Sequence, residues 1–230
     1  MSSRPSPDQL ARWNAELRTA SALETTRWAL ALGGDDTVVS TNFRPYEAVL
    51  LHLATLVQPR IRVLWVDHGY NRAATYRHAE DLRRRLRLDL RAYLPRVTVA
   101  HREALHGPIP EPTDEAAMQA FSKEMKLEPF QRGMRELAPR VWLTALRRDQ
   151  NANRAGLDYV TWDENFQTLK VSPLLDWDDA RLEDYLRAHD LPNEFDYYDP
   201  AKGDPKRECG LHAAWGRQAL ARAEAEVAAR

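Results

Sequence analysis

Two periods of apolar and polar residues run along the chain and predict its elements. Apolar side chains recur at helical spacing over residues 7–32, whereas the short runs at 37–40 and 61–67 indicate strands. Further strands are predicted at 88–94, 141–146, 159–162 and 169–172. Further helices are predicted at 46–57, 73–86, 114–125, 129–137 and 178–189, with a last helix running to residue 230.

This alternation of strands and helices predicts the fold class. It is typical of an α/β protein with an open, mostly parallel sheet, helices on both faces and right-handed crossovers. The run at 61–67 is mostly apolar, as expected for a strand buried on both faces. With 230 residues, 43% of them hydrophobic, the chain can form one sizeable core.

Charge and cysteine content exclude several classes of function. The formal net charge is −1, so no overall basic field favours nucleic acid or a membrane surface. No apolar run is long enough to span a bilayer, and residues 1–5 do not begin a signal peptide. One cysteine cannot form a disulfide or a four-cysteine metal cage within one chain. We expect a reducing cytoplasm and predict no metal site.

Small polar residues follow the predicted strand at 37–40. Ser40, Thr41 and Asn42 stand just before the helix at 46–57, where backbone amides and the helix dipole suit an anion. Arg44 adds a positive charge. The alternative is that one of the three polar residues is an ordinary helix N-cap.

Two other strand ends carry candidate binding residues. Asp67 ends the strand at 61–67, at the sheet edge where α/β proteins bind ligands, although it could simply cap a turn. Arg147, Arg148 and Arg154 follow the strand at 141–146. Their guanidinium groups suit phosphate or sulfate oxygens, and the alternative is a solvated basic loop.

The only cysteine of the chain, Cys209, lies in a charged segment. Lys206 and Arg207 precede it and His212 follows it. Neighbouring cations lower the pKa of a thiol and favour the nucleophilic thiolate. The alternative is an unreactive surface cysteine.

Taken together in this order, these motifs resemble the phosphoadenylyl-sulfate (PAPS) reductases of assimilatory sulfate reduction. That family has the adenine-nucleotide α-hydrolase-like fold, also called the PP-loop fold. The most specific match is Glu-Cys-Gly-Leu-His at 208–212. The matching segments are 39–43, 66–76, 127–130, 144–154, 170–177 and 206–212.

The resemblance implies a mechanism with roles for individual residues. Cys209 would attack the sulfur of PAPS and form S-sulfocysteine, with Arg207 and His212 as further catalytic residues. External thioredoxin or glutaredoxin would then release sulfite, with no bound cofactor and no iron–sulfur cluster. The implied substrate-binding residues are Ser40, Thr41, Asn42, Phe43, Arg44, Asp67, Gly69, Tyr70, Arg147, Arg148, Gln150, Arg154 and Lys170.

The resemblance also implies a domain layout and leaves alternatives open. We expect a nucleotide-binding domain over 1–200, a catalytic tail over 201–230 and a homodimer. The family's phosphate loop continues Phe-Gly, but this chain has Phe43, Arg44 and Pro45, and its segment before Cys209 is shortened. The alternatives are a cluster-free adenylyl-sulfate (APS) reductase or a non-catalytic nucleotide-binding relative. A PP-loop ATP pyrophosphatase is disfavoured, because its Ser-Gly-Gly-x-Asp-Ser loop is absent.

Overall fold

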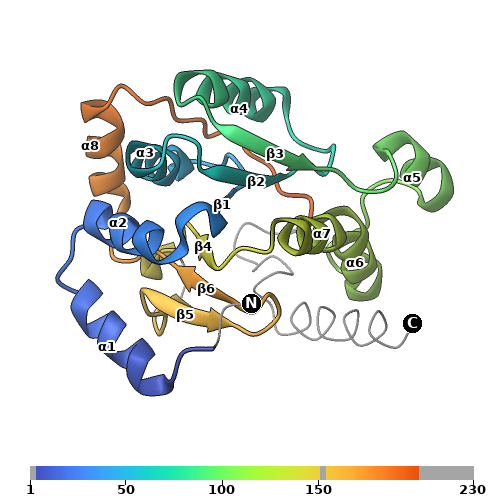
Figure 1. The fold of residues 1–230 in the computed structure, drawn as a ribbon. Helices are drawn as coiled ribbons and strands as arrows, with labels where there is room; N and C mark the ends of the chain where they lie inside the picture. The colour runs from blue at the N-terminus through green and yellow to red at the C-terminus, as the bar shows by residue number, and fades with distance from the viewer. Residues whose placement is uncertain (1–3, 151–153, 202–230) are drawn as a thin grey trace. The chain divides into compact units, whose positions relative to one another are not determined.

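The computed structural model describes residues 4–150 and 154–201, and Figure 1 shows their arrangement. The helices are α1 (Pro7–Leu17), α2 (Ala22–Gly33), α3 (Glu47–Val57), α4 (Ala73–Arg85), α5 (Val99–His106), α6 (Glu115–Ser122), α7 (Glu128–Leu137) and α8 (Asp179–Ala188). The strands are β1 (Thr37–Thr41), β2 (Arg62–Val66), β3 (Asp89–Tyr93), β4 (Val141–Leu143), β5 (Val160–Asp163) and β6 (Thr168–Val171). None of the described helices has the length and apolar character that a membrane span requires.

The six strands form one sheet in the order β3-β2-β1-β4-β6-β5. β1 runs parallel to β2 and β4, β4 runs parallel to β6, and β5 is antiparallel to β6. Helices flank the sheet, with α2 and α3 packed against β1 and against each other. The predicted α/β class with a mostly parallel sheet is therefore confirmed.

The helix predicted over 7–32 is wrong as one element, because the structure has two helices there. Ser21 and Glu24 form a capping box: the Glu24 amide donates to Ser21 Oγ at 3.2 Å, and the Ser21 amide donates to Glu24 Oε2 at 2.7 Å. A capping box satisfies the first amides of a new helix and so starts α2 here.

Three other features of the secondary structure differ from the prediction. Helix α5 was not predicted; it begins after Thr98, whose hydroxyl accepts the amide of His101 at 3.2 Å. The helices predicted at 114–125 and 129–137 are joined by a π-helical turn, Lys123–Leu127. Strand β4 ends at Leu143 instead of 146.

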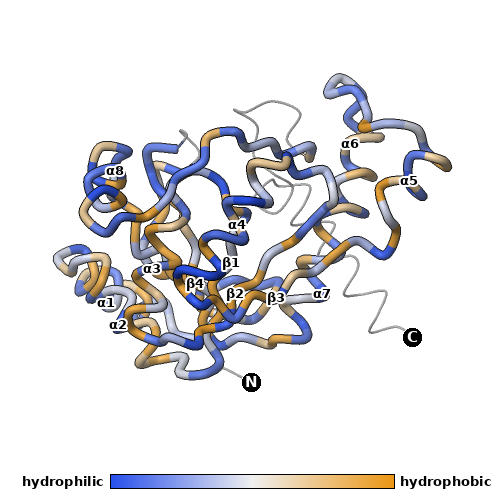
Figure 2. The backbone as a smooth tube through the Cα atoms, turned by 90° about the horizontal axis from the view of Figure 1, so that it is seen from above, coloured by the Kyte–Doolittle hydropathy of each residue, from blue (hydrophilic) through white to orange (hydrophobic). Residues whose placement is uncertain are grey.

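The described chain divides into two compact units. Within the described residues, the first consists of 4–65, 73–91, 137–150 and 154–197, and the second of 66–72, 92–136 and 198–201. The core of the first unit lies around β1, β4 and α3, and Figure 2 shows α3 as strongly apolar and α4 as more polar. The predicted domain boundary at 200 and the predicted terminal helix concern residues that lie largely outside the described part.

Candidate functional site

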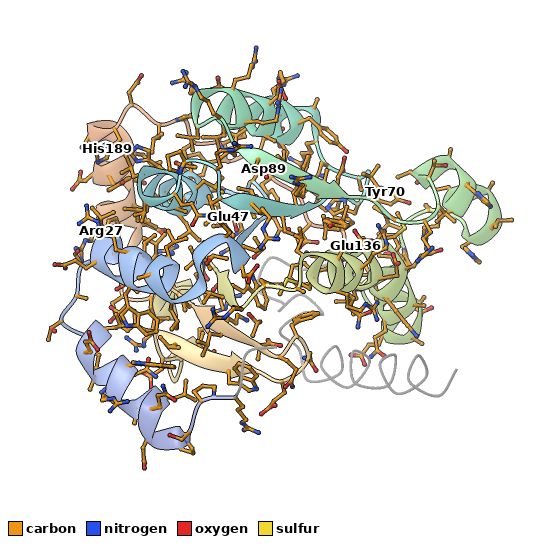
Figure 3. All side chains as sticks on the ribbon, viewed as in Figure 1. Arg27, Glu47, Tyr70, Asp89, Glu136 and His189 are labelled. Carbon is orange, nitrogen blue, oxygen red and sulfur yellow. The ribbon has the colours of Figure 1, made fainter. Side chains whose placement is uncertain are left out.

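The loop after β1, predicted to bind an anion, is held in the structure by a carboxylate of the chain itself. Glu47 Oε2 accepts the hydroxyl of Thr41 and the backbone amide of Asn42, both at 2.7 Å. Glu47 Oε1 lies 3.0 Å from Nε of Arg44. Glu47 is the first residue of α3 and is buried (Figure 3). Two hydrogen-bond donors and one guanidinium group therefore converge on one carboxylate at the start of the helix.

Two further amides of this loop also have acceptors within the chain. The amide of Phe43 donates to Thr41 Oγ1 at 2.9 Å, and that of Tyr46 donates to Asn193 Oδ1 at 2.8 Å. The Phe43 ring is fully buried and meets Trp65 edge-on, with ring centroids 5.1 Å apart. The Phe43 ring therefore belongs to the core and cannot contact a ligand.

Ser40 and Lys170, two predicted binding residues, are connected through Trp142. The indole Nε1 of Trp142 donates to Ser40 Oγ at 2.8 Å, and the Lys170 ammonium lies 4.5 Å from the Trp142 ring centroid. The parallel register explains this arrangement, because Trp142 on β4 is paired with Lys170 on β6. The sequence analysis did not single out Trp142.

The guanidinium group of Arg147 is buried and bound by the chain. It donates to Asp179 at 2.7 Å, to Asp149 at 3.0 Å and to the carbonyl oxygen of Trp177 at 3.0 Å. Arg147 therefore holds the start of α8 against the loop after β4.

The other basic residues of this loop also contact polar groups of the chain. Arg148 donates to Asp176 and, at 3.0 Å, to the carbonyl oxygen of Leu157. Gln150 accepts the amide of Arg147 at 3.2 Å and a guanidinium N–H of Arg154. The structure brings Arg147, Gln150 and Arg154 together, and their predicted contact with substrate stays a prediction.

In the second unit, Asp67 shapes the turn that follows β2. Its Oδ1 accepts the amide of Gly69 and the side-chain amide of Asn71, both at 3.0 Å. Gly69 has a φ of +77°, and a Cβ placed there would lie 2.7 Å from a methyl group of Val99. This position requires glycine because of both its backbone angle and its close neighbour. These contacts are the ones expected if Asp67 caps a turn, which was the alternative to a role in ligand binding.

His68 and Tyr70 complete this turn. The Tyr70 amide donates to His68 Nδ1 at 3.1 Å, and the Tyr70 ring packs against Phe121. Burial, reinforced by the nearby charge of Lys126, lowers the pKa of His68 to about 4. His68 is therefore neutral at neutral pH, and its proton is on Nε2, since Nδ1 accepts a hydrogen bond.

A buried ion pair lies beside His68. The Lys126 ammonium contacts the Asp199 carboxylate, and only 2% and 3% of the two side chains are exposed. Sequence reasoning missed Glu47, Trp142, His68 and this pair. The only signal was position, since His68 lies within a segment that carries the resemblance and Glu47 lies four residues after another.

The predicted catalytic residues Arg207, Cys209 and His212 lie outside the described residues. Their roles, like those of the predicted binding residues, stay predictions. Within the described part, no three His, Cys, Asp or Glu side chains are grouped as metal ligands would be.

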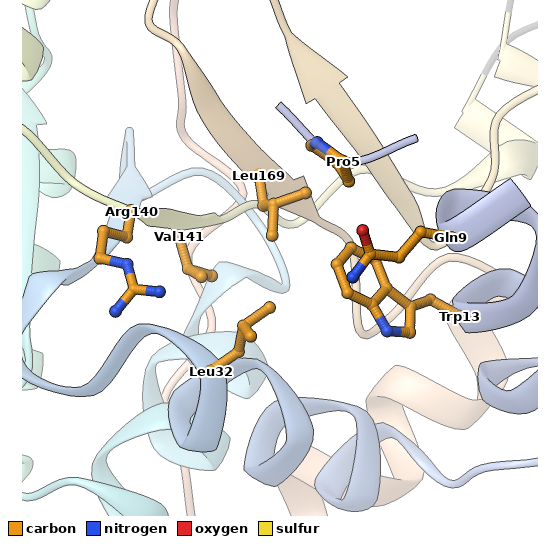
Figure 4. A pocket seen from close by; sticks show the side chains of 7 residues that line it. All are labelled: Pro5, Gln9, Trp13, Leu32, Arg140, Val141 and Leu169. Atoms are coloured by element: carbon orange, nitrogen blue, oxygen red, sulfur yellow. The ribbon is translucent and has the colours of Figure 1, made fainter. Parts of the chain in front are cut away.

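A cavity of about 150 Å³ lies near the amino ends of strands β4 and β6 (Figure 4). It is lined by Pro5, Gln9, Trp13, Leu32, Arg140, Val141 and Leu169. Val141 begins β4 and Leu169 is the second residue of β6, so the cavity adjoins the amino ends of these strands. None of the residues that line it is a predicted binding residue.

Comparison with known proteins gives a consistent result. Residues 36–195 match the family model described as the phosphoadenosine phosphosulfate reductase domain. A phosphoadenosine 5′-phosphosulfate reductase of Synechocystis is 37% identical over 220 residues, covering 86% of this chain and 88% of that protein. One of Photobacterium profundum is 35% identical over 226 residues, covering 89% and 88%.

A solved structure shares the fold. The PAPS reductase of Candida auris, in a phosphate complex, superposes with a TM-score of 0.73 at 22% identity and covers 84% of this chain and 91% of that one. The fold and the family expected from the motifs are thereby confirmed. The chain belongs to the phosphoadenosine phosphosulfate reductase family and is an oxidoreductase of sulfate reduction.

Proposed function

We propose that the chain reduces PAPS to sulfite and adenosine 3′,5′-bisphosphate, with a thioredoxin or glutaredoxin as the electron donor. One observation carries the proposal: a chain of this family has a single cysteine, Cys209, between Glu208 and Gly210 in a basic segment. Neighbouring cations favour the thiolate of such a cysteine. Relatives named for the same substrate cover most of the chain and support this choice.

The reaction has two steps. In the first, the Cys209 thiolate attacks the sulfur of PAPS, an S–S bond forms, and the bond from sulfur to the phosphate oxygen breaks. Adenosine 3′,5′-bisphosphate leaves, and the protein holds S-sulfocysteine. In the second, a thiolate of the external donor attacks Cys209 Sγ and releases sulfite with the electron pair of the S–S bond. The donor's second thiol then resolves the mixed disulfide, so the donor ends as a disulfide and Cys209 as a thiolate.

The described residues offer a rationale for binding this substrate. Lys170, carried on β6 beside Trp142, supplies positive charge near Ser40. We assign it, with Arg44, to the sulfate and phosphate charges, because cations at a developing anion stabilise the leaving group. Asp67 and Tyr70 are assigned to the adenosine, in the turn that Gly69 makes possible. Arg207 and His212 are assigned to keeping Cys209 ionised.

Mass spectrometry of the reductant-free protein mixed with PAPS tests the first step. A sulfonate adduct on Cys209, released as sulfite by reduced thioredoxin, is the expected result. Cys209→Ser should form no adduct and lose turnover. Full turnover by Cys209→Ser would refute the mechanism.

A cluster-free APS reductase is the second candidate, and the altered loop motivates it. Arg44 and Pro45 stand where the family has a glycine, and Arg44 is paired with Glu47. Comparing turnover on PAPS and APS separates the two, because only PAPS has a 3′-phosphate. Binding of adenosine 3′,5′-bisphosphate without sulfite from either nucleotide would instead indicate a non-catalytic relative.

A further inference from the structure

The chain becomes buried shortly before the segment that carries Cys209. Phe195 and Tyr198 are exposed, whereas Asp199 and Ala201 are buried. Both carboxylate oxygens of Asp199 are used: Oδ2 contacts the Lys126 ammonium, and Oδ1 accepts the amide of Ala201 at 3.1 Å. The second contact is an Asx turn around Pro200, whose ring fixes its φ. Asp199 therefore sets both the position and the direction of the chain at this point.

Lys126 reaches Asp199 from an unusual stretch of helix. It lies in the π-helical turn Lys123–Leu127, in which the amide of Glu128 donates to the carbonyl oxygen of Lys123. Met125, Lys126 and Leu127 are all buried there. Such turns carry one extra residue and occur often at functional sites. A buried lysine is rare unless it is paired, so this turn and Asp199 depend on each other.

The segment that contains Asp199 lies near the residues that follow β2. The Arg72 guanidinium lies over the Tyr198 ring, 5.7 Å from its centroid, and the charges of Lys126 and Asp199 both influence His68. The ion pair thus joins the π-helical turn to a segment that packs close to the turn 67–70 in the second unit.

We propose that Lys126 and Asp199 are positioning residues that fix the origin of the Cys209 segment against the turn assigned to the nucleotide. This rests on the proposed function, in which Cys209 is the nucleophile. Cys209 follows Asp199 by ten residues, a span of at most roughly 35 Å when fully extended. Fixing the origin and direction of so short a tether raises the effective concentration of the thiol at the bound substrate. The Lys126–Asp199 pair is then the anchor from which the shortened segment before Cys209 starts.

The test compares Lys126→Met with the double variant Lys126→Met/Asp199→Asn in the full chain. The single change removes the ammonium group from a buried carboxylate and lowers stability. The double change removes both charges, and the side-chain amide oxygen that it introduces can still accept the Ala201 amide. Met134→Ala is the matched control, because Met134 is buried on α7 in the same unit and its truncation lowers stability while both members of the pair stay in the chain.

We expect both Lys126 variants to form the Cys209 sulfonate adduct at least tenfold more slowly per folded molecule than wild type. Affinity for adenosine 3′,5′-bisphosphate, measured by calorimetry, should stay within threefold, and Met134→Ala should keep the wild-type rate. A purely structural role predicts that the double variant recovers the wild-type rate along with its stability. That recovery would overturn the proposal.

A second readout does not depend on the reaction. Because Cys209 is the only cysteine, its alkylation by iodoacetamide can be followed without ambiguity. In wild type, adenosine 3′,5′-bisphosphate should slow this alkylation several-fold, and in both Lys126 variants it should not. Equal protection in all three proteins would refute the anchor. A wild type that shows protection but no adduct from PAPS would refute the proposed chemistry while leaving the anchor supported.

Discussion

The backbone amide of Asn42 donates a hydrogen bond of 2.7 Å to the carboxylate of Glu47. The hydroxyl of Thr41 donates to the same oxygen, so the loop expected to bind an anion already holds one from its own chain. A substrate anion entering this loop meets a buried negative charge. Glu47 therefore sets how strongly the loop attracts an external anion.

Replacing Glu47 by glutamine should tighten the binding of inorganic sulfate about tenfold. The side-chain oxygen of glutamine can still accept from Thr41 and Asn42, so the loop keeps its shape while its negative charge is lost. Removing the negative charge of Glu47 from beside a bound sulfate should improve the free energy of sulfate binding by at least about 1 kcal/mol near a protein surface. Calorimetry with sulfate at fixed ionic strength measures the effect.

Two further variants complete this test. Asp184→Asn makes the same change in net charge on the exposed side of α8 and should leave sulfate binding unchanged. Glu47→Ala should cost about 1–3 kcal/mol of unfolding free energy per donor left buried without a partner. Weaker sulfate binding in Glu47→Gln would mean that the carboxylate orders the loop for its ligand instead of competing with it.

The fold could be predicted because its signals are local. Strands β1 and β2 are short apolar runs, and the antiparallel pair β5 and β6 was predicted within one or two residues at each end. The same locality explains the errors. The break between α1 and α2 depends on the capping box of Ser21 and Glu24, which lies within an otherwise continuous apolar period.

The contacts of the candidate site could not be predicted in the same way. Lys126 has the sequence context of a surface lysine, and its partner Asp199 is 73 positions away. Trp142 meets Ser40 across 102 positions, through a strand register that the sequence does not specify. Binding residues were proposed through the resemblance, whereas the groups that hold them in place became visible only in three dimensions.

Gly69→Ala should lose stability through a steric contact that Gly107→Ala does not make. Both glycines have a positive φ, +77° and +76°, which strains an L-residue, and Gly107 also has a ψ of −171°, where almost only glycine is found. Only at position 69 would the new Cβ also meet a neighbour, the Val99 methyl group at 2.7 Å, and such overpacking costs about 1–3 kcal/mol more. Urea denaturation of the two variants measures the difference.

A double-mutant cycle identifies the cause of that difference. Val99→Ala removes the methyl group that the new Cβ would meet, so it should recover most of the additional loss in Gly69→Ala and none in Gly107→Ala. A loss in Gly69→Ala that Val99→Ala does not reduce would show that the Val99 contact relaxes at no cost.

Lys170→Met should weaken the binding of adenosine 3′,5′-bisphosphate about tenfold and reduce its dependence on salt. The ammonium lies over Trp142, and losing a cation–π contact costs only about 0.5–1 kcal/mol of stability. The effect on binding should therefore exceed the effect on folding. Arg181 is an exposed residue of α8, and its guanidinium lies 4.3 Å from the Trp177 ring centroid. Arg181→Met is therefore a matched control. An equal loss of affinity in both variants would argue against a specific role for Lys170.

His68 should make the protein less stable as the pH falls from about 6.5 to about 4. Burial, with the charge of Lys126, lowers its pKa to about 4, whereas Asp199 and Asp67 act in the opposite direction. Between these values the unfolded chain binds a proton that the folded chain does not, so stability is lost, by roughly 2 kcal/mol at pH 5. The stability difference between wild type and His68→Gln, from urea titrations at pH 7.5 and 5, should change by that amount. His101→Gln, at an exposed position, controls for losing a histidine. An unchanged difference would show that His68 is protonated without cost in the fold.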